Sequence, residues 1–117
     1  MKLMIVDDEE MMRDMLSLVF SEEENIEVIC CSDGLEALNE FDSFLPDVMV
    51  LDLMMPNVDG FEVCRQVREK ATANTRIIIL SGMAGDDVKD KVIALGANEV
   101  YFKPVNIDLL VSSVLSA

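Results

Sequence analysis

Residues 48–63, VMVLDLMMPNVDGFEV, decide the fold because they join a buried strand to a helix through a turn. Val48–Leu51 is an unbroken apolar run that ends at Asp52, a pattern typical of a strand covered on both faces. Residues 56–60, PNVDG, have the composition of a turn, and Asp59 is placed to cap the helix that follows. The stretch therefore predicts a strand, a loop and a helix, with a carboxylate at the end of the strand.

The same alternation of strand and helix patterns extends to both ends of the chain. We expect further strands at residues 3–6, 26–31, 77–80 and 100–102, each followed by apolar residues at helical spacing. Glu27 interrupts the apolar run of the second strand and favours an edge position for it. Five strand–helix repeats predict an α/β fold with a single doubly wound, five-stranded parallel sheet in the order 2-1-3-4-5 and five helices, which is flavodoxin-like. We expect residues 1–117 to form this one domain.

Composition and charge narrow the classes of function. The chain has 23 acidic and 9 basic residues, a formal net charge of −14, and no histidine. Such an acidic surface repels nucleic acid and anionic membranes, so we expect no direct binding to either. No apolar run approaches the roughly 20 residues that span a bilayer, and the first residues do not resemble a signal peptide, so we expect a cytoplasmic protein. The lack of histidine excludes histidine-based acid–base chemistry and a phosphohistidine within this chain.

The cysteines do not indicate a redox or metal site. Cys30, Cys31 and Cys64 lie in apolar patterns and lack CxxC spacing. We therefore expect buried, reduced thiols.

Three acids fall at the carboxyl ends of strands that we expect to be neighbours. Asp7 and Asp8 come directly after the first strand, and Asp52 ends the third. In open α/β sheets, ligands bind in the crevice at such a position. Crowded carboxylates repel one another, and Mg²⁺ is a hard cation that prefers oxygen ligands. We expect Mg²⁺ here, with the backbone carbonyl of Met54 as a further ligand. Taken singly, Asp7 or Asp8 could equally complement a helix N-terminus.

Two more polar side chains end strands at the same edge. Ser81 ends the fourth strand, and Lys103 follows the fifth. A hydroxyl, an ammonium and a metal around one carboxylate suit phosphoryl transfer to that carboxylate. We therefore expect Asp52 to act as the nucleophile, Lys103 and Mg²⁺ to neutralise charge, and Ser81 to bond a phosphoryl oxygen.

Blocks of sequence distributed along the whole chain carry a family resemblance. They are LMIVDDEE at 3–10, VMVLDLMMPNVDGFEV at 48–63, IIILSG at 77–82 and GANEVYFKPV at 96–105. These blocks resemble the receiver domains of two-component response regulators, including the chemotaxis regulators. The resemblance implies a signalling switch in which Asp52 takes a phosphoryl group from a sensor histidine kinase or a phosphotransfer protein. It assigns Asp7 and Asp8 to the metal, Ser81 to the switch hydroxyl and Lys103 to the lysine of the family.

The same resemblance implies several further properties. A cis peptide bond precedes Pro104. The domain is regulatory and not an enzyme, apart from its own phosphoryl transfer and slow self-dephosphorylation. The output surface is formed by the fourth helix, the fifth strand and the fifth helix, and a homodimer through this surface is one option.

The sequence departs from the family at the position that reports phosphorylation. An aromatic residue usually lies three positions before the lysine, but here that position is Val100, followed by Tyr101. Successive strand residues face opposite sides of a sheet, so we do not expect Tyr101 to replace the usual aromatic. Met54 and Met83 occupy positions that influence hydrolysis of the phosphoryl group in the family. Their apolar side chains predict a long-lived phosphoryl state.

Three alternative interpretations use the same residues. A Mg²⁺-dependent phosphatase with an aspartate nucleophile, of the haloacid dehalogenase type, has a second acid where this chain has Met54. A flavodoxin-like binder of FMN needs a phosphate loop after the first strand, where residues 7–10 are all acidic. A purely structural receiver would be expected to lack one of the five site residues, and all five are present.

Overall fold

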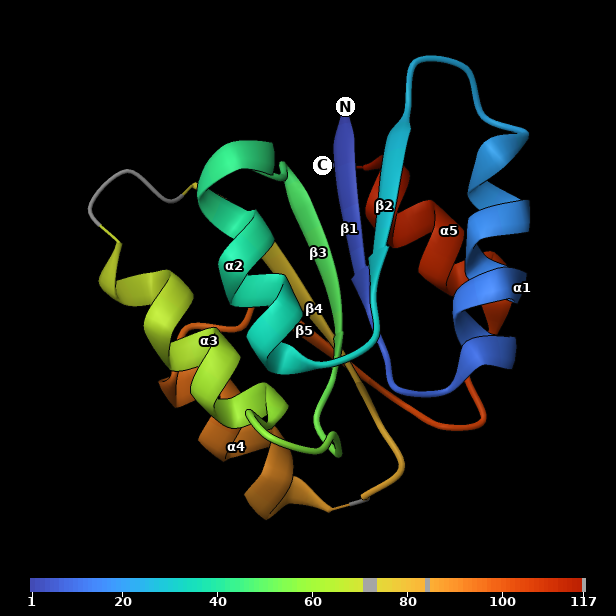
Figure 1. The fold of residues 1–117 in the computed structure, drawn as a ribbon. Coiled ribbons are helices and arrows are strands. Elements are labelled where there is room, and N and C mark those ends of the chain that lie inside the picture. Colours follow the sequence, from blue (N-terminus) through green and yellow to red (C-terminus); the bar gives the residue numbers. More distant parts are fainter. Residues whose placement is uncertain (71–73, 84, 117) are drawn as a thin grey trace.

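The computed structural model describes residues 1–70, 74–83 and 85–116 and shows an open sheet between layers of helices (Figure 1). The strands are β1 (Lys2–Val6), β2 (Glu27–Cys31), β3 (Val48–Asp52), β4 (Arg76–Ser81) and β5 (Glu99–Phe102). The helices are α1 (Glu10–Ser21), α2 (Gly34–Phe44), α3 (Gly60–Glu69), α4 (Asp86–Ala94) and α5 (Ile107–Leu115). Strands and helices alternate along the chain, as the sequence predicts.

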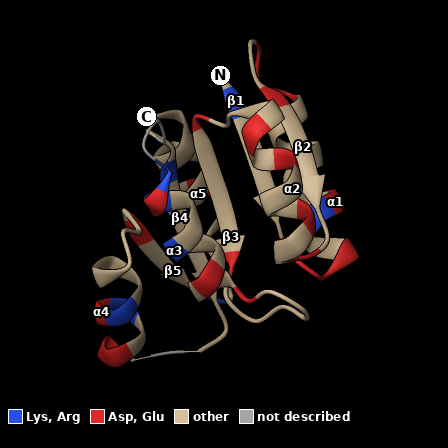
Figure 2. Cartoon of the chain, turned by 60° about the vertical axis from the view of Figure 1, so that its left-hand side comes forward, with Lys and Arg blue, Asp and Glu red and all other residues tan. Residues whose placement is uncertain are grey.

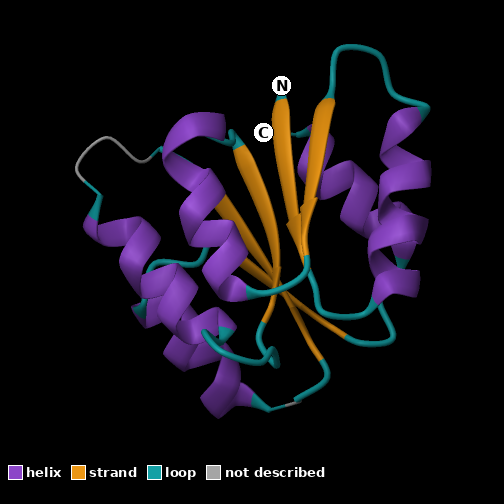
Figure 3. Cartoon of the chain, viewed as in Figure 1, coloured by secondary structure: helices purple, strands orange, loops and turns teal. Residues whose placement is uncertain are grey.

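The sheet is parallel throughout, and its strand order is β2-β1-β3-β4-β5. The predicted α/β architecture and strand order are therefore confirmed. β1 and β3 lie side by side, with Met4 opposite Met49 and Val6 opposite Leu51. Because all strands run in the same direction, their carboxyl ends meet at one edge of the sheet, the lower edge in Figure 3.

Two apolar layers hold the helices against the sheet. On one face, Leu16 and Phe20 of α1 pack with Leu110 of α5 against the strands. On the other face, Phe41 of α2 and Val67 of α3 pack in a layer that also includes α4. Alternate residues of each central strand supply the two layers, since successive strand side chains point to opposite faces. None of the helices in the described part of the chain has the length and apolar composition of a transmembrane segment.

The burial of the strands agrees with their predicted positions in the sheet. Residues 3–6 of β1, all of β3 and residues 77–81 of β4 are buried, as expected for central strands covered on both faces. β2 lies at an edge of the sheet, and Glu27 at its start is exposed. The interrupted apolar run of β2 therefore identified the edge strand correctly.

Aspartates cap two helices, and one of them, Asp59, was predicted from the sequence. The Asp33 side chain accepts a hydrogen bond from the backbone N–H of Glu36 at 2.8 Å, at the start of α2. The Asp59 side chain accepts one from the backbone N–H of Glu62 at 3.0 Å, at the start of α3. Each bond satisfies a donor that the first turn of a helix leaves without an intrahelical partner.

Gly60 brings the start of α3 into close contact with the end of β3. Its backbone N–H donates to the carbonyl of Leu53 at 3.0 Å. A Cβ atom at position 60 would lie 2.4 Å from the carbonyl oxygen of Asp52, so a larger residue does not fit without a shift of the backbone. Glycine at this position therefore lets the β3–α3 loop pack directly behind Asp52.

The cysteines are free thiols, and two of them are buried as predicted. Cys31 and Cys64 are buried, and burial raises the pKa of Cys31 to about 12. Cys30 is only half-buried, which corrects the prediction for this residue. It packs against the layer under α1 and α5 from the edge strand β2, whereas Cys31 points into the opposite layer.

Candidate functional site

The predicted site residues lie at the carboxyl edge of the sheet. Asp7 follows β1, Asp52 is the last residue of β3, Ser81 is the last residue of β4, and Lys103 follows β5. The parallel order places these strand ends next to one another, at the edge where open α/β sheets bind ligands.

Three carboxylates gather at this edge. Asp7, Asp8 and Asp52 each offer an oxygen atom, and these atoms all lie within 4.8 Å of one another. Asp7 is 1% exposed and Asp52 is 3% exposed, whereas Asp8 is exposed to solvent. Carboxylate oxygens at this spacing are suitable ligands for a hard divalent cation. The expected convergence of the three acids is therefore found in the structure.

The loop that carries Asp7 is fixed by contacts of its backbone and side chain. The Asp7 N–H donates to the carbonyl of Cys31 at 3.1 Å, and Arg13 Nη1 donates to the carbonyl of Asp7 at 2.8 Å. The Asp7 side chain in turn accepts a hydrogen bond from the Glu9 N–H at 2.9 Å. These bonds hold the carboxylate toward Asp52.

Lys103 is the cation of the site among the described residues. Its Nζ lies 3.6 Å from Asp52 Oδ1, 3.4 Å from Asp7 Oδ2 and 3.2 Å from Glu9 Oε1. The Lys103 side chain is 17% exposed, so these pairs are screened less than ion pairs in open solvent. The Lys103–Pro104 bond is cis, as the resemblance implied.

The proximity of these charges changes how they ionise. Burial raises the pKa of Asp52 to about 6, and the charge of Asp7 adds to this effect, whereas Lys103 opposes it. Burial also raises the pKa of Asp7. Burial lowers the pKa of Lys103, but the charges of Asp52 and Asp7 outweigh this and leave it raised. One ammonium thus only partly compensates the carboxylates, and a divalent cation would lower the pKa of Asp52 further.

The Ser81 hydroxyl lies at the predicted edge but is bonded to its own loop. Ser81 is fully buried. Its Oγ accepts a hydrogen bond from the Met83 N–H at 2.9 Å and donates one to the Met83 carbonyl at 2.8 Å. A phosphoryl oxygen at the site would have to take the hydroxyl from Met83. The sequence could locate Ser81 but could not show this local pairing.

Met54 follows the site in the β3–α3 loop. Its side chain is 58% exposed, and a hydrogen bond from its backbone lowers the pKa of Asp52. The expected role of the Met54 carbonyl as a metal ligand stays a prediction.

Val100 and Tyr101 face opposite sides of the sheet, as predicted. Val100 packs against the layer under α2, α3 and α4, and Tyr101 packs against the layer under α1 and α5. The Tyr101 hydroxyl donates to Glu99 Oε2 at 3.1 Å, which ties its ring to the start of β5. Tyr101 therefore does not occupy the side of the sheet on which the family places its reporting aromatic.

Two residues that contact the site were not predicted from the sequence. Glu9 reaches Lys103, and Arg13 bonds the backbone of Asp7 from inside α1. An acid after Asp8 and a basic residue in the first helix are common features of acidic, helical surfaces. Their contacts depend on side-chain directions that spacing alone does not reveal.

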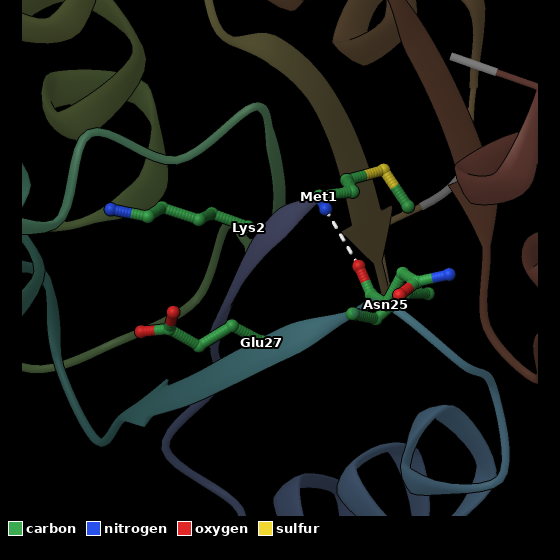
Figure 4. Close-up of a pocket in the computed structure, with 5 residues that line it drawn as sticks. Met1, Lys2, Asn25 and Glu27 are labelled. Atoms are coloured by element: carbon green, nitrogen blue, oxygen red, sulfur yellow. Dashed lines mark hydrogen bonds between the residues drawn. The ribbon is translucent and has the colours of Figure 1, made fainter.

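A pocket lies at the opposite end of β1 and β2. This shallow pocket of about 340 Å³ is lined by Met1, Lys2, Asn25, Ile26 and Glu27 (Figure 4). The amino group of Met1 donates to the carbonyl of Asn25 at 2.7 Å across it. The pocket is separated from the carboxylates by the length of β1, so it plays no part in the acidic site.

Comparison with known proteins identifies the family. Residues 3–115 match the response regulator receiver domain. The chain is 36% identical over 114 residues to response regulator RR06 of Streptococcus pneumoniae, covering 97% of this chain and 51% of that protein. It is 40% identical over 105 residues to the alkaline phosphatase synthesis transcriptional regulatory protein PhoP of Bacillus subtilis, covering 88% of this chain and 42% of that protein. The chain thus spans about half or less of these relatives.

Solved structures agree with this result. The signal receiver domain of a DNA-binding response regulator from Colwellia psychrerythraea superimposes with a TM-score of 0.91 at 30% identity, covering 98% of this chain and 95% of that one. The receiver domain of the Francisella response regulator 1452 superimposes with a TM-score of 0.89 at 31% identity, covering 97% and 92%. The chain therefore belongs to the response regulator receiver domain family of two-component signal transduction.

Proposed function

We propose that Asp52 accepts a phosphoryl group from the phosphohistidine of a sensor histidine kinase or a phosphotransfer protein. One observation supports this above all: Asp52 is 3% exposed, its carboxylate lies 3.6 Å from Lys103 Nζ, and its oxygens lie within 4.8 Å of those of Asp7 and Asp8. In this reaction a carboxylate oxygen of Asp52 attacks phosphorus, the phosphorus–nitrogen bond of the donor breaks, and the imidazole leaves. Lys103 offsets negative charge on the transferring group.

Asp7, Asp8 and Asp52 are the residues that we propose to hold Mg²⁺, with the backbone carbonyl of Met54 as a further ligand. The support is the donor set itself, three carboxylates whose oxygens lie within 4.8 Å of one another. When bound, Mg²⁺ would supply positive charge against both the carboxylates and the transferring phosphoryl group.

The proposed switch follows from the dianion that phosphorylation adds at Asp52. The Ser81 hydroxyl exchanges its two bonds with Met83 for a phosphoryl oxygen, and Lys103 pairs with the phosphoryl group. This exchange pulls on the β4–α4 connection and shifts an existing conformational equilibrium. With Val100 in place of an aromatic residue, the signal passes to the output surface without the rotamer change usual in the family.

We propose that the output surface consists of α4, β5 and α5, which can also form a homodimer. α4 carries both acidic and basic residues, visible as red and blue bands in Figure 2. The net charge of −14 supports our proposal that this chain does not itself bind nucleic acid or membranes. We further propose that residues 1–117 act as one cytoplasmic regulatory domain and not as an enzyme, apart from slow self-dephosphorylation.

The direct test is to incubate the chain with Mg²⁺ and acetyl phosphate and to follow its mass. The wild type should gain the mass of one phosphoryl group and lose it in hydroxylamine, which cleaves acyl phosphates. Asp52→Asn should gain nothing, whereas Asp47→Asn, a change of another aspartate outside the crevice, should behave like the wild type. Labelling that persists in Asp52→Asn, or sustained turnover of a small phosphomonoester in the manner of a phosphatase, would contradict the proposal.

A further inference from the structure

Glu9 contacts the site twice although it was not among the residues predicted for it. Its backbone N–H donates to Asp7 Oδ1 at 2.9 Å, and its carboxylate oxygen lies 3.2 Å from Lys103 Nζ. The Glu9 contact is the shortest of the three carboxylate contacts of this ammonium, since Asp7 lies at 3.4 Å and Asp52 at 3.6 Å. The lysine that phosphoryl transfer needs is therefore nearest to an acid other than the phosphoacceptor.

A simpler role for Glu9 would be to serve α1, because helix N-termini favour negative charge. Glu9 is the N-cap residue of α1, yet its side chain makes no capping hydrogen bond. The side chain instead reaches Lys103, which is 94 positions away in the sequence. Glu10, in the first turn of α1, has the same relation to the helix but no ion pair with Lys103. The helix thus accounts for the charge of both residues but not for the direction of the Glu9 side chain.

We propose, building on the phosphoacceptor function proposed above, that Glu9 is a positioning residue that competes with Asp52 for Lys103 and thereby opposes the phosphoryl state. A phosphoryl dianion on Asp52 requires the charge of Lys103, so the ammonium must leave Glu9 as the dianion forms. The Glu9 side chain is 62% exposed, and water can solvate its carboxylate once the pair breaks. The competition is therefore modest, and Glu9 slows the phosphorylation of Asp52 without preventing it.

Two matched variants test this inference. Glu9→Gln and Glu10→Gln each remove one negative charge from the start of α1, but only the first removes the ion pair with Lys103. With acetyl phosphate and Mg²⁺, Glu9→Gln should be phosphorylated about two- to five-fold faster than the wild type, the range expected for a partly exposed ion pair. Glu10→Gln should match the wild type. Equal rates for the two variants, or slower phosphorylation of Glu9→Gln, would overturn the inference.

A spectroscopic measurement separates positioning from a general effect on the fold. The side-chain ¹⁵N resonance of Lys103 should move in Glu9→Gln and stay in place in Glu10→Gln, both measured before phosphorylation. If the Lys103 resonance moves equally in the two variants, Glu9 does not pair specifically with Lys103, and the inference is wrong. Failure of the wild type to take any phosphoryl group overturns the proposed function, and this inference with it. A labelled wild type with indistinguishable variants overturns the inference alone.

Discussion

Replacing Asp52 by asparagine should stabilise the protein at neutral pH when no divalent cation is present. The folded state raises the pKa of Asp52 from 3.8 to about 6, and each pH unit between these values corresponds to about 1.4 kcal/mol. Ionised Asp52 therefore destabilises the fold by roughly 3 kcal/mol at pH 7. Because the folded pKa is the higher one, this penalty is absent below pH 3.8 and grows as the pH rises through 6.

The assay is urea unfolding followed by far-ultraviolet circular dichroism between pH 4 and 8, in the presence of a chelator. The free energy of unfolding of Asp52→Asn should exceed that of the wild type by up to about 3 kcal/mol at pH 7, and the two should approach each other near pH 4. Added Mg²⁺ should narrow the difference, because a bound cation favours the ionised carboxylate. The exposed Asp90 of α4 provides a control, since Asp90→Asn removes a surface carboxylate and should leave the free energy of unfolding close to that of the wild type.

Two results would refute this reasoning. The first is a wild type that is as stable as Asp52→Asn at pH 7 without cations, which would mean that Lys103 fully compensates the buried charge. The second is a difference between the two proteins that is the same at pH 4 and pH 7, which would assign the effect to packing instead of ionisation.

Three further predictions concern the backbone and the loop after Asp52. Leu45→Asn should raise the free energy of unfolding by about 0.5–1 kcal/mol, because exposed Leu45, which follows the end of α2, adopts a left-handed conformation with φ of 51°. The control Leu35→Asn, at an exposed position inside α2, should not raise it. Gly60→Ala should lower the free energy of unfolding by more than about 2 kcal/mol, because the alanine Cβ would lie 2.4 Å from the Asp52 carbonyl oxygen. The control Gly82→Ala should be tolerated, because a Cβ at that position has no atom within 4 Å. Met54→Asn should shorten the lifetime of the phosphoryl group on Asp52 several-fold, because an amide can orient an attacking water and the thioether cannot. The lifetime is measured by mass spectrometry as the loss of the phosphoryl mass with time. An unchanged lifetime would contradict the role given to Met54.

Much of the fold could be predicted because strands that are buried on both faces consist of apolar residues. Val48–Leu51 has no polar residue to place against solvent, so it had to be a central strand. Glu27 could not lie in such a strand, which left the edge for β2. Once the order was set, parallel strands alone placed Asp7 and Asp52 together, without any information on side chains.

The remaining features depend on distances that periodicity does not encode. Ser81 ends its strand as predicted. Its hydroxyl bonds Met83 because the backbone N–H and carbonyl of Met83 both lie within hydrogen-bond distance. The contact between Glu9 and Lys103 joins two loops through flexible side chains. Cys30 and Cys31 are neighbours in β2 but pack against opposite layers, and only Cys31 is fully covered; a run of apolar residues does not reveal this difference.

The hydrogen bond of Tyr101 has a practical consequence for optical work on this protein. The chain contains one tyrosine and no tryptophan, so its intrinsic fluorescence comes from a single ring in β5. The hydroxyl of that ring bonds the carboxylate of Glu99, and the emission therefore senses the start of β5 directly. Tyr101 is thus an intrinsic fluorophore on the proposed output surface. Its emission can report a change in β5 on phosphorylation of Asp52 without an added label.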